Sequence, residues 1–268
     1  MPKVKVKGVG LHYVEVGSGE PLLLIMGFGG DHLAWGFQVG AFSERCRVIS
    51  FDNRGAGQSD VPDVPYTTRM MADDAVGLLD ALGIDRAHIL GVSMGGMIAQ
   101  EVALNHPGRV RSVQLHCTYA RPDRYMLALM EAWRAVRAKA TPEEWMRTVA
   151  LWLFSPLTFQ ERPELIETII QTALTSPHPF SLTGFLRQGD AVRSHDALDR
   201  LPKLTRPALV SVAADDTLVP PRFAREVAAA IPGAELRVID GAGHCYFWET
   251  PDVFNAMCLD FIASHSTV

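Results

Sequence analysis

Short apolar runs alternate with longer amphipathic stretches along most of the 268-residue chain. Each apolar run has the length of one buried strand, and each amphipathic stretch has the spacing of a helix. We expect strands at 22–26, 47–51, 88–92, 110–116, 208–213 and 235–239, and helices at 67–82, 97–105, 221–231 and 251–264. This repeated order predicts an α/β fold with a mostly parallel, twisted sheet and helices on both faces. The alternation of Lys and Val at 3–7 predicts an edge strand.

The strand pattern stops near residue 119 and returns near residue 206. The intervening segment has helical patterns and many aromatic residues, and Thr141-Pro142 followed by Glu144 is typical of a helix start. We therefore expect a core domain formed by 1–118 and 206–268, with an inserted helical cap, or lid, at 119–205.

Composition narrows the class of protein. Apolar residues make up 48% of the chain, and 25 basic against 30 acidic residues give a net charge of −5, which disfavours a nucleic-acid partner. No apolar run approaches the ~20 residues of a membrane span, and the N-terminus has no signal-peptide core. The four cysteines lack CxxC spacing, and no nucleotide-binding or HExxH motif is present. We expect a cytoplasmic protein without membrane, metal or cofactor, and the oligomeric state stays open.

The strongest chemical signal is Gly91-Val92-Ser93-Met94-Gly95, between a predicted strand and a predicted helix. A serine on such a tight turn needs small neighbours, which Gly91 and Gly95 provide. The turn places the Ser93 hydroxyl above the sheet, beside the backbone N–H groups of a helix N-terminus. Ser93 is therefore the candidate nucleophile, and it needs a base.

Among nine histidines, His244 is the best candidate base because it directly follows the loop after the last predicted strand. That position lies at the carboxyl edge of the sheet, where ligands of open α/β sheets bind. His12 and His32 stay open as candidates. His195 falls in the insertion and is expected to face solvent.

A carboxylate is needed to orient the base. Asp215 and Asp216 both follow the strand at 208–213, and either can face the site. Asp52 also ends a strand at this edge and is a weaker competitor. A role in the turn of its own loop, with its carboxylate bonded to the backbone at 55–57, is more natural for Asp52.

The order Ser93, Asp216, His244 resembles that of the α/β-hydrolase superfamily, and the resemblance runs from about Leu11 to Ile262. The stretch 213–220 is similar to the family pattern Gly-x-x-Asp-x-x-x-Pro if Asp216 is the acid, with Ala213 in place of the glycine. The runs 241–251 and 52–59 are also similar to loops of that family. The resemblance implies that Ser93, Asp216 and His244 form a catalytic triad, although Asp215 stays an alternative for the acid.

The same resemblance implies an oxyanion hole. Met-Gly-Phe-Gly at 26–29 is similar to the family's His-Gly-x-Gly, with Met26 as the departure. The implied donors are the backbone N–H groups of Phe28 and Met94. Haloalkane dehalogenases and epoxide hydrolases of the superfamily have aspartate where this chain has Ser93, which argues against both activities.

We therefore expect a serine hydrolase that cleaves a carboxylic ester of a hydrophobic small molecule through an acyl-enzyme intermediate. The expected partner is a small hydrophobic ester or lactone, held under the aromatic cap. One alternative is an enol-lactone or carbon–carbon bond hydrolase of aromatic degradation with the same triad. Another is a ligand-sensing protein of this fold with little turnover.

Overall fold

The computed structural model describes residues 2–266. The predicted core domain, 1–118 and 206–268, also includes residues 1 and 267–268, which lie outside the described residues. Its centre is an eight-stranded sheet of order β1-β2-β4-β3-β5-β6-β7-β8. The strands are β1 (Lys3–Val6), β2 (Val9–Val16), β3 (Glu20–Ile25), β4 (Cys46–Phe51), β5 (Ala87–Val92), β6 (Val110–His116), β7 (Ala208–Ala213) and β8 (Glu235–Ile239). Strands β3 to β8 pair in parallel, and β1 and β2 pair antiparallel.

The predicted α/β class and the mostly parallel sheet are confirmed. The predicted strands 110–116, 208–213 and 235–239 have the observed bounds, and β1 is an edge strand, as the Lys and Val alternation indicates. Strand β2 was not predicted. Its polar residues, His12 among them, interrupt the apolar pattern, although His12 is buried in the structure.

The helices are α1 (Val39–Ser43), α2 (Thr68–Ala81), α3 (Met94–Asn105), α4 (Arg124–Arg137), α5 (Pro142–Leu153), α6 (Pro156–Glu161), α7 (Pro163–Leu174), α8 (Leu182–Ser194), α9 (Pro221–Ala230), α10 (Tyr246–Glu249) and α11 (Pro251–Ser264). Short 3₁₀ helices are η1 (His32–Trp35), η2 (Pro107–Arg109) and η3 (Leu198–Lys203). Helix α3 begins three residues before the predicted 97–105, because the chain turns directly from β5 into the helix at Ser93.

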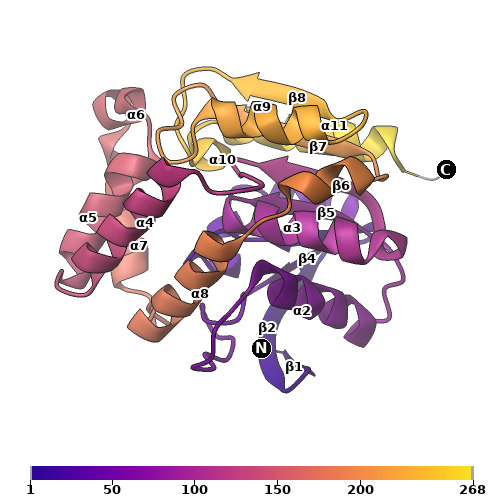
Figure 1. Ribbon diagram of the computed structural model, residues 1–268, viewed down its shortest axis with the longest axis horizontal. Coiled ribbons are helices and arrows are strands. Elements are labelled where there is room, and N and C mark those ends of the chain that lie inside the picture. Colours follow the sequence, from indigo (N-terminus) through magenta and orange to yellow (C-terminus); the bar gives the residue numbers. More distant parts are fainter. Residues whose placement is uncertain (1, 267–268) are drawn as a thin grey trace.

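Helices cover both faces of the sheet, as predicted. Helices α2, α3 and α9 pack on one face, and α1, α10 and α11 lie on the other (Figure 1). Each face of the sheet has its own apolar cluster. Leu79 and Ile98 belong to the cluster under α2, α3 and α9, and Phe42 and Phe254 belong to the cluster under α1, α10 and α11. The sheet is therefore buried between two layers, which fixes the positions of the loops at its carboxyl edge.

Residues 119–205, all of which are described, contain helices and no strand. Helices α4 to α8 gather at one side of the molecule, beyond the carboxyl edge of the sheet (Figure 1). The capping box predicted at Thr141 and Glu144 is present at the start of α5. We refer to α4–α8 as the helical insertion.

The expectation that His195 faces solvent is wrong. His195 follows α8 and is buried, with Nδ1 2.9 Å from Thr68 Oγ1 and Nε2 3.3 Å from Gln100 Oε1. These contacts attach the end of the insertion to α2 and α3 of the core.

In the described part of the chain, the helices are too short or too polar to span a bilayer.

Candidate active site

Ser93 occupies a strained turn between β5 and α3. Its backbone has φ 55° and ψ −121°, and residues other than glycine rarely adopt a positive φ. The turn is tight: a Cβ on Gly91 would lie 2.1 Å from Gly95 O, and a Cβ on Gly95 would lie 2.0 Å from Ile25 O. Glycine is therefore required at both positions, as the sequence indicates, and the turn presents Ser93 at the carboxyl edge of the sheet.

His244 and Asp216 form a buried pair. Asp216 lies in the loop after β7 and His244 in the loop after β8, and Asp216 Oδ2 is 2.8 Å from His244 Nδ1. The second carboxylate oxygen of Asp216 accepts a hydrogen bond from Val219 N–H at 2.7 Å. The carboxylate thus favours a proton on Nδ1 of His244, which leaves Nε2 with its lone pair to accept another. Asp215 is exposed, and Asp216 rather than Asp215 contacts the histidine.

Ser93 is hydrogen-bonded to the residues on either side of Cys117, which follows β6: Ser93 N–H donates to His116 O at 2.9 Å, and the Thr118 hydroxyl donates to Ser93 O at 2.8 Å. Burial, and then the negative charge of Asp216, raise the pKa of the Cys117 thiol, whereas a backbone hydrogen bond from Ser93 opposes the increase. Cys117 is thus bracketed by contacts to Ser93, and its thiol is influenced by the charge of Asp216. Within residues 2–266, Ser93 Oγ makes no hydrogen bond, to His244 or to another group. Catalytic contacts of this kind are often long in proteins without substrate.

The loop after β3 lies directly against Ser93. A Cβ on Gly27 would be 3.0 Å from Ser93 Cβ, so the loop can approach this closely only with glycine at that position. Among the described residues, neither Phe28 N–H nor Met94 N–H has a protein acceptor. The two N–H groups that the resemblance implies as oxyanion donors therefore have no acceptor within the described residues.

The helical insertion covers the loop that contains Phe28 with aromatic side chains. The Phe28 ring packs edge-on against Phe180 and Phe185, with ring centroids 5.5 and 5.1 Å apart. Trp145 packs on Phe185 at 5.2 Å, and Trp133 packs on Trp145 at 5.6 Å. This aromatic cluster joins the insertion to the core and makes the surroundings of Phe28 apolar.

Glu249 of α10 ties the histidine loop to the insertion, and the sequence did not indicate this role. The buried carboxylate accepts hydrogen bonds from Gly243 N–H at 2.7 Å, from Ser155 N–H at 2.9 Å and from the Thr158 hydroxyl. Cys245 N–H also donates to Leu153 O at 2.8 Å. Gly243 is thus linked through Glu249 to Ser155 and Thr158, and Cys245 is bound directly by the last residue of α5. The only available signal was the similarity of the run 241–251 to a family loop.

His12, His32 and Asp52 form a second buried cluster, in which each carboxylate oxygen of Asp52 faces one imidazole. His32 Nδ1 lies 2.7 Å from Asp52 Oδ1, and His12 Nδ1 lies 3.2 Å from Asp52 Oδ2. The hydrogen bond to Asp52 raises the pKa of His32, and burial lowers that of His12.

Donor atoms of these three residues lie within 4.8 Å of one another, close enough to be considered as a metal site. However, Asp52 is already hydrogen-bonded: it accepts from His32 N–H and Gln58 N–H, both at 2.8 Å. The 2.7 Å between His32 and Asp52 also matches a hydrogen bond better than the ~3.3 Å between neighbouring ligands of a tetrahedral zinc ion. Asp52 binds the backbone of its own loop, as expected, but at Gln58 N–H, one residue beyond the expected 55–57. These residues provide a scaffold for the adjacent loops.

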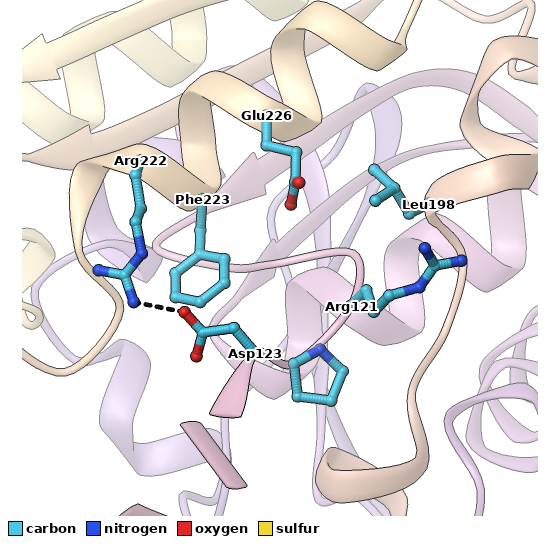
Figure 2. Close-up of a pocket in the computed structure, with 7 residues that line it drawn as sticks. Arg121, Asp123, Leu198, Arg222, Phe223 and Glu226 are labelled. Carbon is cyan, nitrogen blue, oxygen red and sulfur yellow. Dashed lines mark hydrogen bonds and ion pairs between the residues drawn. The ribbon is translucent and has the colours of Figure 1, made fainter. Parts of the chain in front are cut away.

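A surface hollow of about 360 Å³ lies at the two ends of the insertion (Figure 2). Arg121 and Asp123 line it where the chain enters the insertion, Leu198 where the chain leaves it, and Phe223 of α9 forms one wall. Arg222 closes one side through a 2.7 Å hydrogen bond to Asp123. Ser93, Asp216 and His244 do not line this hollow, so it is separate from the candidate active site.

Comparison with known proteins agrees with this geometry. The chain is 33% identical to a protein of Azorhizobium caulinodans named as a carbamate hydrolase, over 97% of this chain and 98% of that protein. A thermophilic esterase from Thermogutta terrifontis superposes with a TM-score of 0.89 at 30% identity, covering 99% of this chain and all of the esterase. The enol-lactonase from Burkholderia xenovorans superposes with a TM-score of 0.90 at 28% identity, covering 98% of this chain and all of that one.

The sequence profile of the α/β hydrolase fold matches residues 20–251, which include Ser93, Asp216 and His244. The relative from Azorhizobium caulinodans is named as a hydrolase, and the esterase and the enol-lactonase, which have the same fold as this chain, are named for hydrolytic activities. The chain therefore belongs to the α/β hydrolase family and is a hydrolase.

Proposed function

We propose that the protein hydrolyses carboxylic esters of small hydrophobic molecules through an acyl-enzyme on Ser93. The observation that carries the proposal is the strained turn at Ser93, with the unpaired N–H groups of Phe28 and Met94 beside it. The buried Asp216–His244 pair at the same edge of the sheet supports it. The similarity to an esterase and an enol-lactonase agrees with acyl transfer.

In the first half-reaction, Ser93 Oγ attacks the ester carbonyl carbon, and its proton passes to His244 Nε2. Asp216 holds the proton on Nδ1 and stabilises the imidazolium that forms. The carbon–oxygen bond to the alcohol then breaks, and His244 returns its proton to the leaving oxygen. The alcohol departs and the acyl group remains on Ser93.

The tetrahedral intermediate places a negative charge on the former carbonyl oxygen. The N–H groups of Phe28 and Met94 are the proposed donors to this oxygen, and the N-terminus of α3 adds a favourable dipole. Losing one such donor costs about 3 kcal/mol of transition-state stabilisation.

In the second half-reaction, His244 takes a proton from water, and the resulting hydroxide attacks the acyl carbon. The bond between that carbon and Ser93 Oγ breaks, Oγ regains a proton from His244, and the carboxylic acid leaves. The aromatic cluster around Phe28 favours a hydrophobic substrate, because apolar walls exclude water and strengthen the interactions with the oxyanion.

The direct test compares the wild-type protein with Ser93→Ala on short p-nitrophenyl esters. We expect turnover by the wild type and a decrease of roughly 10⁴-fold or more in kcat for the variant. Circular dichroism and the unfolding midpoint verify that the variant is folded. Equal turnover by the two proteins, purified in parallel, would contradict the proposal.

The similarity to the Burkholderia xenovorans enol-lactonase makes a cyclic ester the second candidate substrate. The same acyl-enzyme mechanism applies, except that the leaving alcohol stays attached to the acyl group. A panel that pairs open-chain esters with lactones of equal carbon number separates the two classes. We expect a higher kcat/KM for the open-chain esters. A consistently higher kcat/KM for the lactones would instead identify a cyclic ester as the substrate class.

A further inference from the structure

Gln188 of α8 lies completely buried between the helical insertion and two loops of the core. Its Oε1 accepts a hydrogen bond from Gly29 N–H at 2.9 Å, and its Nε2 donates to Arg54 O, also at 2.9 Å. One side-chain amide thus joins the loop after β3 to the loop after β4. Both polar ends of the amide are satisfied, so an apolar replacement leaves the partly buried N–H of Gly29 and the buried C=O of Arg54 without this partner.

The backbone of α8 is held at this place by close packing. A Cβ on Gly184 would lie 2.1 Å from Gly55 O, so the first turn of the helix rests directly on the loop after β4. Phe185 packs on Phe28 with ring centroids 5.1 Å apart. Gln188 therefore reaches Gly29 from a fixed position.

The contact to Gly29 has a direct consequence for Phe28. Gly29 N–H lies in the planar peptide group that begins at the Phe28 carbonyl, and Phe28 N–H lies in the preceding planar group. Only the φ and ψ angles of Phe28 separate the two groups, so holding one of them limits the orientation of the other. Gly29 has φ 75°, a region that glycine enters and leaves at little cost. On the other side of Phe28, Asn53 Nδ2 donates to Met26 O at 2.8 Å. Gly27 O, in the same peptide group as Phe28 N–H, accepts from Gly30 N–H at 3.2 Å. Hydrogen bonds thus hold both peptide groups that flank Phe28.

We propose that Gln188 is a positioning residue for the oxyanion hole. Its amide holds the loop after β3 so that Phe28 N–H points to the oxygen of the tetrahedral intermediate. Because Gln188 belongs to the insertion, the placement of α8 on the core then controls the reactivity of a core residue. This inference rests on the proposed ester hydrolysis at Ser93.

The test uses Gln188→Met, which retains the length of the side chain and removes both its donor and its acceptor. We expect kcat for p-nitrophenyl butyrate to decrease about 10- to 100-fold, below the 10²- to 10³-fold loss of a complete oxyanion donor. KM should stay within about twofold, because the contact acts on the transition state and not on substrate binding.

Gln114→Met is the matched control. Gln114 is also completely buried and donates to Cys258 O at 3.3 Å from the middle of β6; within residues 2–266 its side chain makes no hydrogen bond to the loop after β3. We expect this variant to lose stability and to keep its kcat. An equal decrease of kcat in the two variants would overturn the proposal, because it would show a general effect of a buried amide.

Amide hydrogen exchange gives a readout independent of turnover. The peptide that covers residues 27–30 should exchange at least about tenfold faster in Gln188→Met and at the wild-type rate in Gln114→Met. Wild-type kcat, or wild-type exchange at 27–30, in Gln188→Met would overturn the proposal while the ester hydrolysis of the wild type stands. Absence of turnover by the wild-type protein would instead contradict the proposed function itself.

Discussion

The carboxyl edge of the sheet and the helical insertion contribute to the candidate site in different ways. At the edge, the chemistry depends on neighbours in sequence: Ser93 is presented by Gly91 and Gly95, and Asp216 is held by Val219 three residues later. The insertion acts over long sequence separations. Gln188 and Gly29 are 159 residues apart, and Ser155 and Glu249 are 94 residues apart.

This difference separates two kinds of role. The edge provides groups that can exchange protons or bind charge, whereas the insertion provides hydrogen bonds that orient the loops around these groups. Changes at the edge should therefore remove activity and leave the fold intact. Changes in the insertion should reduce both activity and stability, by smaller amounts.

The largest effect is expected for Asp216→Asn. The amide leaves the geometry almost unchanged but favours the wrong proton position on His244, so kcat should decrease by roughly 10⁴-fold. Asp215→Asn, which changes the exposed neighbour, should retain wild-type kcat. Steady-state kinetics on one p-nitrophenyl ester tests both. A larger loss for Asp215→Asn would reverse the assignment of the acid.

The next largest effect is a decrease in the free energy of unfolding as the pH falls. It involves one buried histidine at the carboxyl edge and one at the end of the insertion. Burial lowers the pKa of His116 in β6 to about 3 and that of His195 after α8 to about 4. Unfolded histidines take up a proton near pH 6.5, so between that pH and the folded pKa the unfolded state binds more protons. Stability should thus decrease as the pH falls from about 6.5, by up to ~1.4 kcal/mol per pH unit for each histidine, and this loss saturates below the folded pKa.

Urea unfolding at several pH values between 7 and 5 measures this slope. His195→Gln should reduce it, because one of the buried histidines no longer titrates, whereas the exposed His178→Gln should retain it. An unchanged slope in His195→Gln would mean that protonation of His195 does not weaken the attachment of the insertion.

A smaller effect is expected for Glu249→Gln. The amide can accept at one atom only, so one of the contacts to Gly243, Ser155 or Thr158 is lost, at a cost of about 1.5–3 kcal/mol of unfolding free energy. The looser histidine loop should also lower kcat, by roughly tenfold. The exposed Glu226→Gln in α9 is the control and should match the wild type in both measurements. A variant with lower stability and unchanged kcat would show that Glu249 supports the fold alone.

The sequence predicted the parts of the fold that depend on local pattern. β7 is buried at every position and is almost entirely apolar, so its bounds were predicted as observed. The bounds of β6 and of the partly exposed edge strand β8 were also predicted as observed. The turn at Ser93 was predictable because its geometry requires glycine at 91 and 95. Asp215 and Asp216 could not be separated in this way, since neighbouring residues on one turn can point in opposite directions. The structure buries Asp216 and exposes Asp215.

The remaining features depend on contacts that no local pattern contains. His195 was expected in solvent because its partners Thr68 and Gln100 are 127 and 95 residues away. Gln188 and Glu249 were missed for the same reason. Gln188 lies in the middle of a helix, and Glu249 lies two residues before Pro251. Each acquires its role only when distant loops pack against it.

The nucleophile can be tested by covalent capture. An alkyl fluorophosphonate reacts with a serine that has both an active base and an oxyanion hole, and peptide mass spectrometry locates the adduct. We predict one phosphonyl group per chain, on Ser93, formed in proportion to the loss of ester turnover. Full loss of turnover with Ser93 unmodified, or an adduct on another residue, would contradict the account.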